Sequence, residues 1–175
     1  MSNSINEQAI VIKELLNDDG KFPNSGLYLL MYKKAFIIDE NTGADYIEKT
    51  FRQNNWTNSW RAGIFDYAHY HTNTHEVLGV FKGTATVQFG GENGIIKIIN
   101  IGDVVIIPAG VAHKCLQSDD DFNCVGAYPG GINYDIKKGE PGDRPKADKN
   151  IQKVPLPEND PVYKEGPLQL NWEIQ

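Results

Sequence analysis

The sequence lacks the features by which membrane and nucleic-acid-binding proteins are recognised. Its 175 residues carry 17 Lys and Arg against 23 Asp and Glu, for a formal net charge of -6, and the basic residues form no run. Because phosphate binding favours clustered Lys and Arg, we expect no nucleic-acid partner. No stretch approaches the roughly 20 apolar residues that span a bilayer. The opening MSNSINEQAIVIKELL also lacks the basic and unbroken apolar segments of a secretory signal. These absences predict a cytoplasmic protein that contacts no membrane.

Internal repeats are also missing, and the length suits one domain. Apolar residues at roughly helical spacing predict a helix over residues 5–17, which DDG ends. The aromatic and apolar run LYLLMYKKAF predicts a strand over 27–36. A short surface helix is predicted over 41–55, opened by a capping Asn or Thr. This part, residues 1–55, is expected to form a helix and strand extension that packs on the main body.

Short apolar runs separated by turn residues dominate the chain from Trp60 onward. In order they are RAGIFDY, EVLGVF, TATVQF, GIIKII, DVVIIP, AHKCLQ and FNCVGAY. Many short strands with Gly-rich turns and no helices between them predict an all-β antiparallel sandwich or barrel, with its core in residues 56–128. Because IIKII and VVIIP are apolar at consecutive positions, both faces of those strands are expected to be covered. One face would be the barrel interior, and the other would meet a dimer partner or the chain's own tail.

Proline gathers in the last part of the chain. Residues 129–175 hold seven of the nine prolines, with many charges and no sustained periodicity. Pro-rich polar segments are often disordered, but this one also carries apolar side chains such as Val154, Val162 and Trp172. We therefore expect an ordered, irregular tail that wraps the barrel and belongs to the same domain.

Histidine is rare, yet three of the four histidines fall within the stretch AHYHTNTHEVLGVFKG. His69 and His71 are two residues apart, so on a strand both imidazoles point to one face. Glu76 begins the next strand and can turn back as an oxygen ligand. His75 is its direct neighbour and is expected to point the opposite way. The fourth histidine, His113, begins a later strand that can lie beside His69 and His71 in a closed antiparallel barrel.

Three imidazoles and one carboxylate together predict a metal site. Neutral imidazole is the commonest metal-binding side chain in proteins. With positions left for water, the set suits one divalent first-row ion, and Fe, Mn, Ni, Co, Cu and Zn remain as alternatives. The predicted ligands are His69, His71, Glu76 and His113.

The spacing of these residues resembles that of the cupin family. The first cupin motif is G, five residues, HxH, three or four residues, E, six residues, G, and the stretch from Gly63 to Gly83 fits it at every position. The second motif is G, five residues, PxG, two residues, H, three residues, N. The stretch from Gly102 fits it through His113 but ends in Gln117 instead of Asn, a departure that touches no ligand. The resemblance implies a double-stranded β-helix, or jelly-roll barrel, and the same four metal ligands.

A narrower resemblance, from about Trp56 onward, is to the YjlB-like branch of single-domain cupins. It is carried by HYH, HEVLGV, GDVVIIPAGVAHK and VGAYPGG, and by the tail pieces RPKAD, VPLPENDPVY and GPL. This resemblance supports the fold and the site and implies no particular reaction.

The metal site and the resemblance favour a metal-dependent enzyme that acts on a small chelating molecule. A diketone, catechol, hydroxy acid or sugar-derived acid could replace water on the ion. Iron would then favour dioxygenase chemistry, whereas Zn, Mn or Ni would favour isomerase or lyase chemistry. The candidate catalytic residues are Glu76, which can detach as a base, and His75, which can orient Glu76 or act as an acid–base group at the barrel mouth. The alternatives are a non-catalytic metal or small-ligand binding or sensor protein, and a barrel that its metal only stabilises.

Three further interpretations concern packing and assembly. If SDDD closes a hairpin, Cys115 lies opposite Cys124, and the two are either reduced core cysteines or a redox-sensitive pair beside the metal. Aromatic residues of the strands are expected in the barrel wall or at an interface; they are Tyr67, Tyr70, Phe81, Phe89 and Tyr128. Because doubly apolar strands need cover and cupins commonly pair through their sheets, we expect a homodimer.

Overall fold

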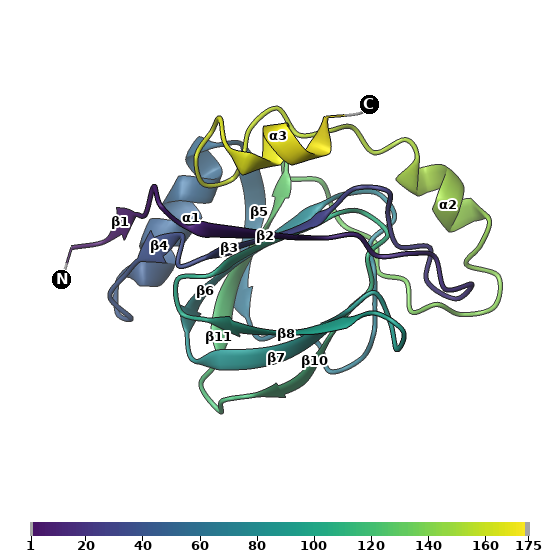
Figure 1. Cartoon of the computed structure of the whole chain (residues 1–175), viewed down its shortest axis with the longest axis horizontal. Coiled ribbons are helices and arrows are strands. Elements are labelled where there is room, and N and C mark those ends of the chain that lie inside the picture. The colour runs from purple at the N-terminus through teal and green to yellow at the C-terminus, as the bar shows by residue number, and fades with distance from the viewer. Residues whose placement is uncertain (1, 174–175) are drawn as a thin grey trace.

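Two antiparallel β-sheets face each other in the computed structural model, which describes residues 2–173 (Figure 1). The larger sheet has six strands, in the order β2 (Ile10–Glu14), β3 (Leu29–Lys33), β9 (Val104–Ile107), β6 (Glu76–Lys82), β11 (Asn123–Pro129) and β5 (Trp56–Ala62). The smaller sheet has three, in the order β10 (His113–Ser118), β7 (Thr84–Phe89) and β8 (Ile95–Asn100). A separate short pair joins β1 (Ser4–Ile5) to β4 (Phe36–Ile37). The predicted all-β jelly-roll fold is confirmed.

The space between the two sheets is filled by apolar side chains from both. Because successive residues of a strand point to opposite faces, Leu29 and Met31 of β3 lie in this inner core with Val87 of β7. Leu30 and Tyr32, which alternate with them, lie on the outer face of the larger sheet. Fully burying an aliphatic side chain of this size contributes about 1.5–3 kcal/mol, so the larger sheet is stabilised from both sides.

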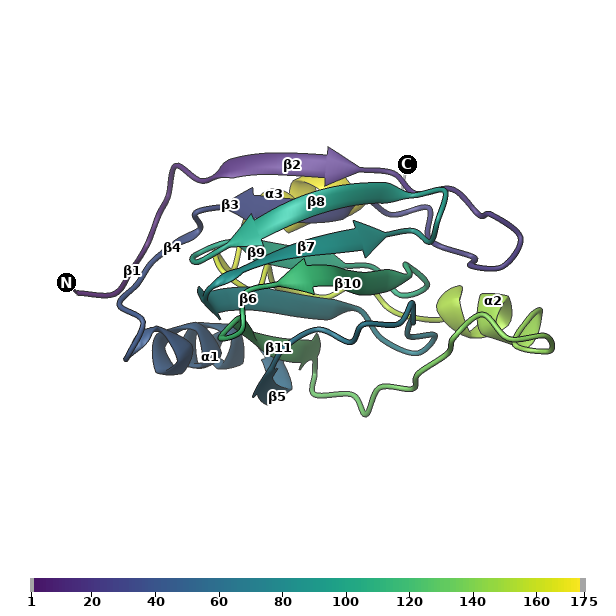
Figure 2. The same cartoon turned by 90° about the horizontal axis from the view of Figure 1, so that it is seen from below.

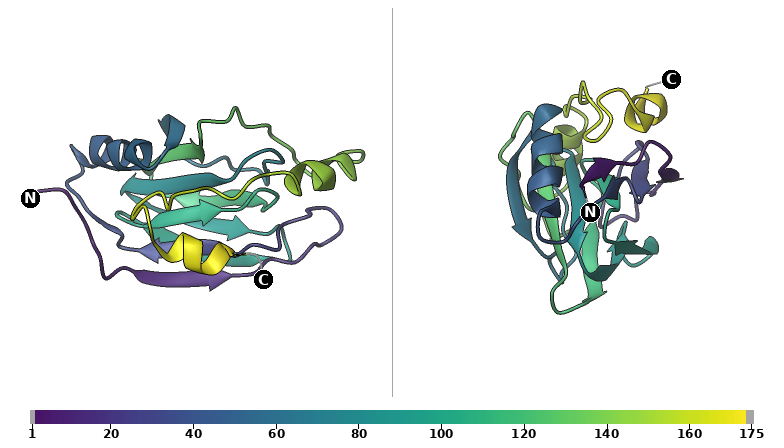
Figure 3. Two further views of the ribbon diagram at one scale, coloured as in Figure 1. Left: turned by 90° about the horizontal axis from the view of Figure 1, so that it is seen from above. Right: turned by 90° about the vertical axis from the view of Figure 1, so that its left-hand side faces the viewer.

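The outer face of the larger sheet is covered by the chain itself. Helix α1 (Gly43–Gln53) packs Ile47 and Phe51 against it. The C-terminal tail crosses the same face and ends in α3 (Pro167–Trp172), as Figure 3 shows. Trp172 is buried there, and its Nε1 donates to the Tyr28 carbonyl at 2.8 Å. The covering of the outer face of β9, whose four residues are all buried, is therefore supplied by the chain rather than by a partner.

The smaller sheet differs, because the outer face of β8 is open. Ile96 and Ile98 are 58% and 57% exposed in the single chain. The expectation that both faces of IIKII are covered is not met within the described residues 2–173.

The N-terminal helix predicted over residues 5–17 is wrong. Residues 10–14 instead form β2, which pairs with β3 at one edge of the larger sheet. The run Ile10, Val11, Ile12 is β-branched, which favours a strand, and only Ile12 of the three packs against the inner core. The helix predicted over 41–55 is confirmed as α1, and the strand predicted over 27–36 is confirmed as β3. Because β3 lies inside the sheet between β2 and β9, the barrel core is not confined to residues 56–128.

Two strand predictions in the middle of the chain also need correction. The run RAGIFDY is strand only at its first two residues, since β5 ends at Ala62 and residues 63–67 have no regular structure. The run SDDD does not close a hairpin: β10 pairs with β7, whereas β11 pairs with β5 and β6 in the other sheet. This turn therefore carries the chain from one sheet to the other.

The C-terminal tail is mostly irregular and contains two short helices. These are α2 (Lys146–Ile151) and α3. Within residues 2–173 no helix is long and apolar enough to span a membrane.

Candidate metal centre

The fold brings His69 and His113 side by side. The His113 amide donates to the His69 carbonyl at 2.9 Å, and the His69 amide donates to the His113 carbonyl at 3.2 Å. The turn before His113 is fixed by Gly110, whose amide donates to the His71 carbonyl at 2.8 Å. Gly110 has φ of 96°, which other residues resist, and a Cβ there would lie 2.2 Å from the Asn24 carbonyl oxygen. The predicted approach of the His113 strand to His69 and His71 is confirmed.

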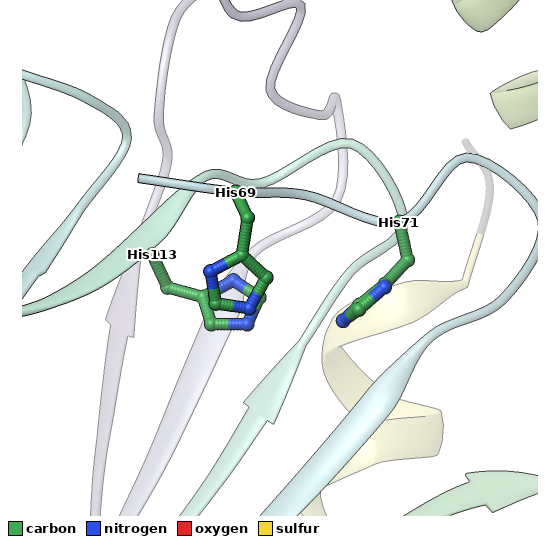
Figure 4. A group of neighbouring side chains, drawn as sticks. All are labelled: His69, His71 and His113. Atoms are coloured by element: carbon green, nitrogen blue, oxygen red, sulfur yellow. The ribbon is translucent and has the colours of Figure 1, made fainter. Parts of the chain in front are cut away.

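Main-chain carbonyls fix the orientation of all three imidazoles. Each Nδ1 lies against a carbonyl oxygen; the pairs are His69 with Tyr67 at 3.1 Å, His113 with Val111 at 3.1 Å, and His71 with Asp135. Because a carbonyl oxygen only accepts, each Nδ1 carries a proton, so in the neutral ring it is Nε2 that keeps the lone pair. Figure 4 shows the three rings turned toward a common space, and their ligand atoms all lie within 4.8 Å of one another. This arrangement fits the ligation of one metal ion.

Glu76 adjoins this set at the first position of β6. Its Oε2 lies 3.2 Å from His71 Nε2 and 3.1 Å from His113 Nε2, and its side chain is buried. Burial alone would raise the pKa of this carboxyl group, but attraction to the charged form of the facing His71 and the contacts with both rings outweigh burial and hold the pKa well below its usual range. Glu76 is therefore an anionic oxygen donor directed at the same space as the imidazoles.

The pKa values of the two imidazoles in the HxH pair, His69 and His71, are shifted in opposite directions. Burial, assisted by repulsion from His113, lowers the pKa of His69 to about 3. Burial also disfavours the charged form of His71, but the Glu76 carboxylate outweighs it and raises the pKa of His71. His69 is thus held in the neutral form that binds metals, and His71 and Glu76 form a coupled pair.

A chain of hydrogen bonds holds the other oxygen of Glu76. Tyr128 lies 2.9 Å from Glu76 Oε1, and Trp60 Nε1 lies 2.7 Å from the Tyr128 oxygen. An indole N–H can only donate, so the Tyr128 oxygen accepts from Trp60 and its own proton points to Glu76. The sequence suggests only a packing role for Tyr128, because parity along one strand does not show which residues of a neighbouring strand approach it.

A segment of the tail, residues 133–137, runs beside the strand of His71. Tyr70 and Lys137 exchange both main-chain hydrogen bonds at 2.9 Å. The Asp135 carboxylate accepts from the Thr72 amide at 2.6 Å and from the Thr72 hydroxyl, while the Asp135 carbonyl accepts from His71 Nδ1. The segment therefore fixes one ligand ring. The sequence contains no signal for this, because the tail has no periodicity that would predict pairing.

A cavity of about 220 Å³ opens beside the four residues. One end is polar, being formed by the three imidazoles and Glu76. The remaining wall is apolar or aromatic, and its residues are Trp60, Ala62, Ile64, Phe65, Leu78, Tyr128 and Tyr134. The site thus has both a donor set and room for a small organic molecule.

His75 faces away from this cavity, as the alternation along the strand predicts. Its Nδ1 accepts from the Ala109 amide at 2.9 Å, and its Nε2 lies 3.2 Å from the Pro155 carbonyl, to which it donates. The ring packs against Trp172, with centroids 4.8 Å apart, and burial lowers the pKa of His75 to about 4. Both ring nitrogens are thus engaged with the main chain. His75 ties the tail to the barrel and has no nitrogen to offer a substrate.

The two cysteines do not take the arrangement that a hairpin would give. Both are free thiols, on strands that belong to different sheets. Cys124 is fully buried, donates to the Ala62 carbonyl at 3.3 Å, and has its pKa raised by burial. The register in which Cys115 lies opposite Cys124 is wrong, because β10 pairs Cys115 with Val87.

Comparison with known proteins assigns the barrel to a family. Residues 63–127 match the family model described as Cupin. Uncharacterized protein YjlB of Bacillus subtilis (strain 168) is 45% identical over 157 residues, which cover 89% of this chain and 92% of that protein.

Two solved structures show weaker similarity. Acireductone dioxygenase from Bacillus anthracis, with a cadmium ion in its active centre, is 15% identical with a TM-score of 0.40, over 71% of this chain and 80% of that one. A DUF861-family protein from Thermotoga maritima is 21% identical with a TM-score of 0.35, over 56% of this chain and 96% of that one. Similarity at this level assigns no reaction to this chain.

Proposed function

The chain belongs to the cupin family as a single-domain member, and on that premise we propose that it binds one divalent transition-metal ion. The ligands are Nε2 of His69, His71 and His113 and the carboxylate of Glu76. The observation that carries the proposal is the fixing of each Nδ1 by a carbonyl oxygen, because it turns the three Nε2 atoms, which carry the lone pairs of the neutral rings, toward one buried space before any ion arrives. Such hydrogen bonds to ligand histidines hold the tautomer and ring orientation that metal binding needs.

We propose further that the protein is an enzyme acting on a small chelating organic molecule, of the dioxygenase or isomerase type. The cavity beside the ligands supports this over a purely stabilising role for the ion, since a structural site needs no adjoining space. A bound ion would supply Lewis acidity or, in the case of iron, oxygen activation. The apolar wall excludes water from the polar end, and Tyr128 keeps the proton of its hydroxyl directed at Glu76.

Glu76 is the residue of this chain best placed to move a proton. One of its oxygens faces the imidazoles and the other accepts from Tyr128, so the carboxylate can shift between the ligand position and a free position without leaving its hydrogen-bond partner. The alternative function is a non-catalytic metal or small-ligand binding or sensor protein. It predicts the same metal and the same ligand affinity but no conversion of the ligand on prolonged incubation.

The decisive experiment is elemental analysis of protein purified without added metal, on the wild type and two variants. We expect close to one ion per chain in the wild type and loss of the ion in His113→Ala. His75→Gln is the matched control: it removes a buried imidazole from the adjacent sequence position of Glu76 and should retain the ion. A wild type without bound metal, or a His113→Ala protein with unchanged metal content, contradicts the proposal.

A further inference from the structure

We infer that the molecule that binds in the cavity has a small, uncharged aromatic body joined to a head of two adjacent oxygen donors. This inference rests on the proposed metal function for the binding of the head, and on the cavity wall for the choice of the body. An aromatic ligand of this kind should therefore bind more tightly than a sugar-derived or other polyhydroxylated acid with the same chelating head.

Cavity size limits the ligand first. A buried apolar cavity of about 150 Å³ is known to hold benzene, so a cavity of about 220 Å³ holds one ring with a few substituents, on the order of ten non-hydrogen atoms. Among the described residues that line it, charge is confined to Glu76 and the imidazoles at one end. The body of the ligand therefore meets no side chain that would pair with a charge.

The hydrogen-bonding groups of the wall are already used. Trp60 Nε1 donates to the Tyr128 oxygen at 2.7 Å, and the Tyr128 proton goes to Glu76 at 2.9 Å. The wall's remaining polar side-chain group is the hydroxyl of Tyr134, a residue 37% exposed at the mouth. A hydroxyl of the ligand body buried against this wall would lose its water without a replacement partner, at a cost of about 1–3 kcal/mol for each group.

Aromatic rings form the part of the wall that a ring would contact. Tyr134 stacks on Tyr128 with centroids 4.6 Å apart, and the Tyr134 ring also meets His71 edge-on at 5.2 Å. Phe65, which is 47% exposed and also lines the cavity, meets the His69 ring edge-on at 5.2 Å. A ligand ring that follows these two contacts toward the imidazoles gains aromatic packing as its oxygen donors reach the polar end.

The test uses pairs of ligands that share a head and differ in the body. Protein loaded with zinc, which is redox-inert, is titrated by calorimetry with 4-methylcatechol against 3,4-dihydroxybenzoate, and with mandelate against glycerate. We expect the member with the uncharged or aromatic body to bind about tenfold more tightly in each pair. Phe65→Ser should reduce this preference severalfold. Leu170→Ser, which removes an apolar side chain that is 80% exposed on α3, should leave it unchanged.

Zinc content measured on the same samples separates the two proposals. Zinc-loaded wild type that binds both members of each pair equally overturns the inference about the ligand and leaves the metal function standing. Protein that takes up no zinc overturns the metal function and this inference with it. A preference that survives Phe65→Ser undiminished, or that Leu170→Ser abolishes, places recognition outside the cavity and also overturns the inference.

Discussion

His69 and His113 are main-chain partners as well as neighbouring side chains. Each amide donates to the other residue's carbonyl, and the two imidazole centroids lie 4.1 Å apart. The distance between these two proposed ligands is therefore set by the backbone of the barrel, and the third ring is set by the Asp135 carbonyl. A site held in this way exists before the ion binds, so we expect folding and metal binding to be separable.

Removing the metal with a chelator should accordingly lower stability and leave the fold intact. An ion that binds only the folded state contributes RT ln(1 + [L]/Kd), about 2.7 kcal/mol at a free concentration of 100 Kd. The far-ultraviolet circular dichroism spectrum should be unchanged on chelation, whereas the thermal midpoint should fall and should recover when metal is added back. His113→Ala should show no such metal-dependent shift. Loss of the β spectrum on chelation would mean that the ion assembles the barrel.

Replacing Tyr128 with Phe should weaken metal binding by about 10- to 100-fold, the range typical for partners of metal ligands. The substitution removes the hydroxyl between Trp60 and Glu76, so the carboxylate loses the bond that fixes its direction. Competition with a chelating dye would measure the affinity. Tyr134→Phe is the matched control, because it also removes a tyrosine hydroxyl from the cavity wall and leaves the Tyr128–Glu76 bond in place. Equal affinities for wild type and Tyr128→Phe would show that Glu76 needs no such support.

The proposed ligands could be read from the sequence because their geometry is local or nearly so. The parity of a strand puts His69 and His71 on one face and turns His75 away, and both relationships hold in the structure. His113 needs one long-range step, which the closure of the barrel supplies. The glycine of the Pro-Ala-Gly stretch also marks the turn before His113 in the sequence, and Gly110 has a φ of 96° there, which few other residues adopt.

The surroundings of the site could not be read in the same way. Tyr128 reaches Trp60 and Glu76 through the register of three strands, and a bulge between Gly126 and Tyr128 shifts that register against β5. Asp135 lies in a tail without periodicity, so its contact with His71 leaves no pattern in the sequence. The helix predicted over residues 5–17 fails because pairing with β3 decides the conformation of β2, and a spacing of apolar residues does not report a pairing partner.

The pH dependence of stability should reveal how the tail is held to the N-terminal part. Arg144 donates to Asp18 at 2.7 Å and to Asp148 at 2.6 Å, and its hydrogen bonds lower the pKa of Asp18 from 3.8 to about 2. A carboxyl group whose pKa is lowered by folding contributes stability above its unfolded pKa and loses it as the pH falls through the folded one. Because the groups are partly exposed, Arg144→Gln should cost only about 0.5–1 kcal/mol at pH 7.

This difference between wild type and Arg144→Gln should shrink as the pH falls from about 4 toward 2. Urea unfolding of both proteins at pH 7 and at pH 3 would measure it. A difference that is the same at both pH values would mean that packing of the Arg144 side chain, and not its charge, holds the tail.

The open face of β8 bears on assembly, and the homodimer stays a prediction. Ile96 and Ile98 on β8 and Ile10 on β2 are all more than half exposed. Figure 2 looks onto the outer face of the smaller sheet, with β8, β7 and β10 toward the viewer, and Lys97 of β8 bridges to Glu14 of β2 at 2.6 Å. Exposed apolar residues gathered on the outer face of a sheet are typical of a surface that another protein covers. Light scattering coupled to size-exclusion chromatography should give twice the mass of one chain for the wild type and a single-chain mass for Ile98→Glu.

Leu170→Ser, whose exposed side chain lies on α3, should keep the wild-type mass. A monomeric wild type, or an Ile98→Glu protein that still dimerises, would place any partner surface elsewhere.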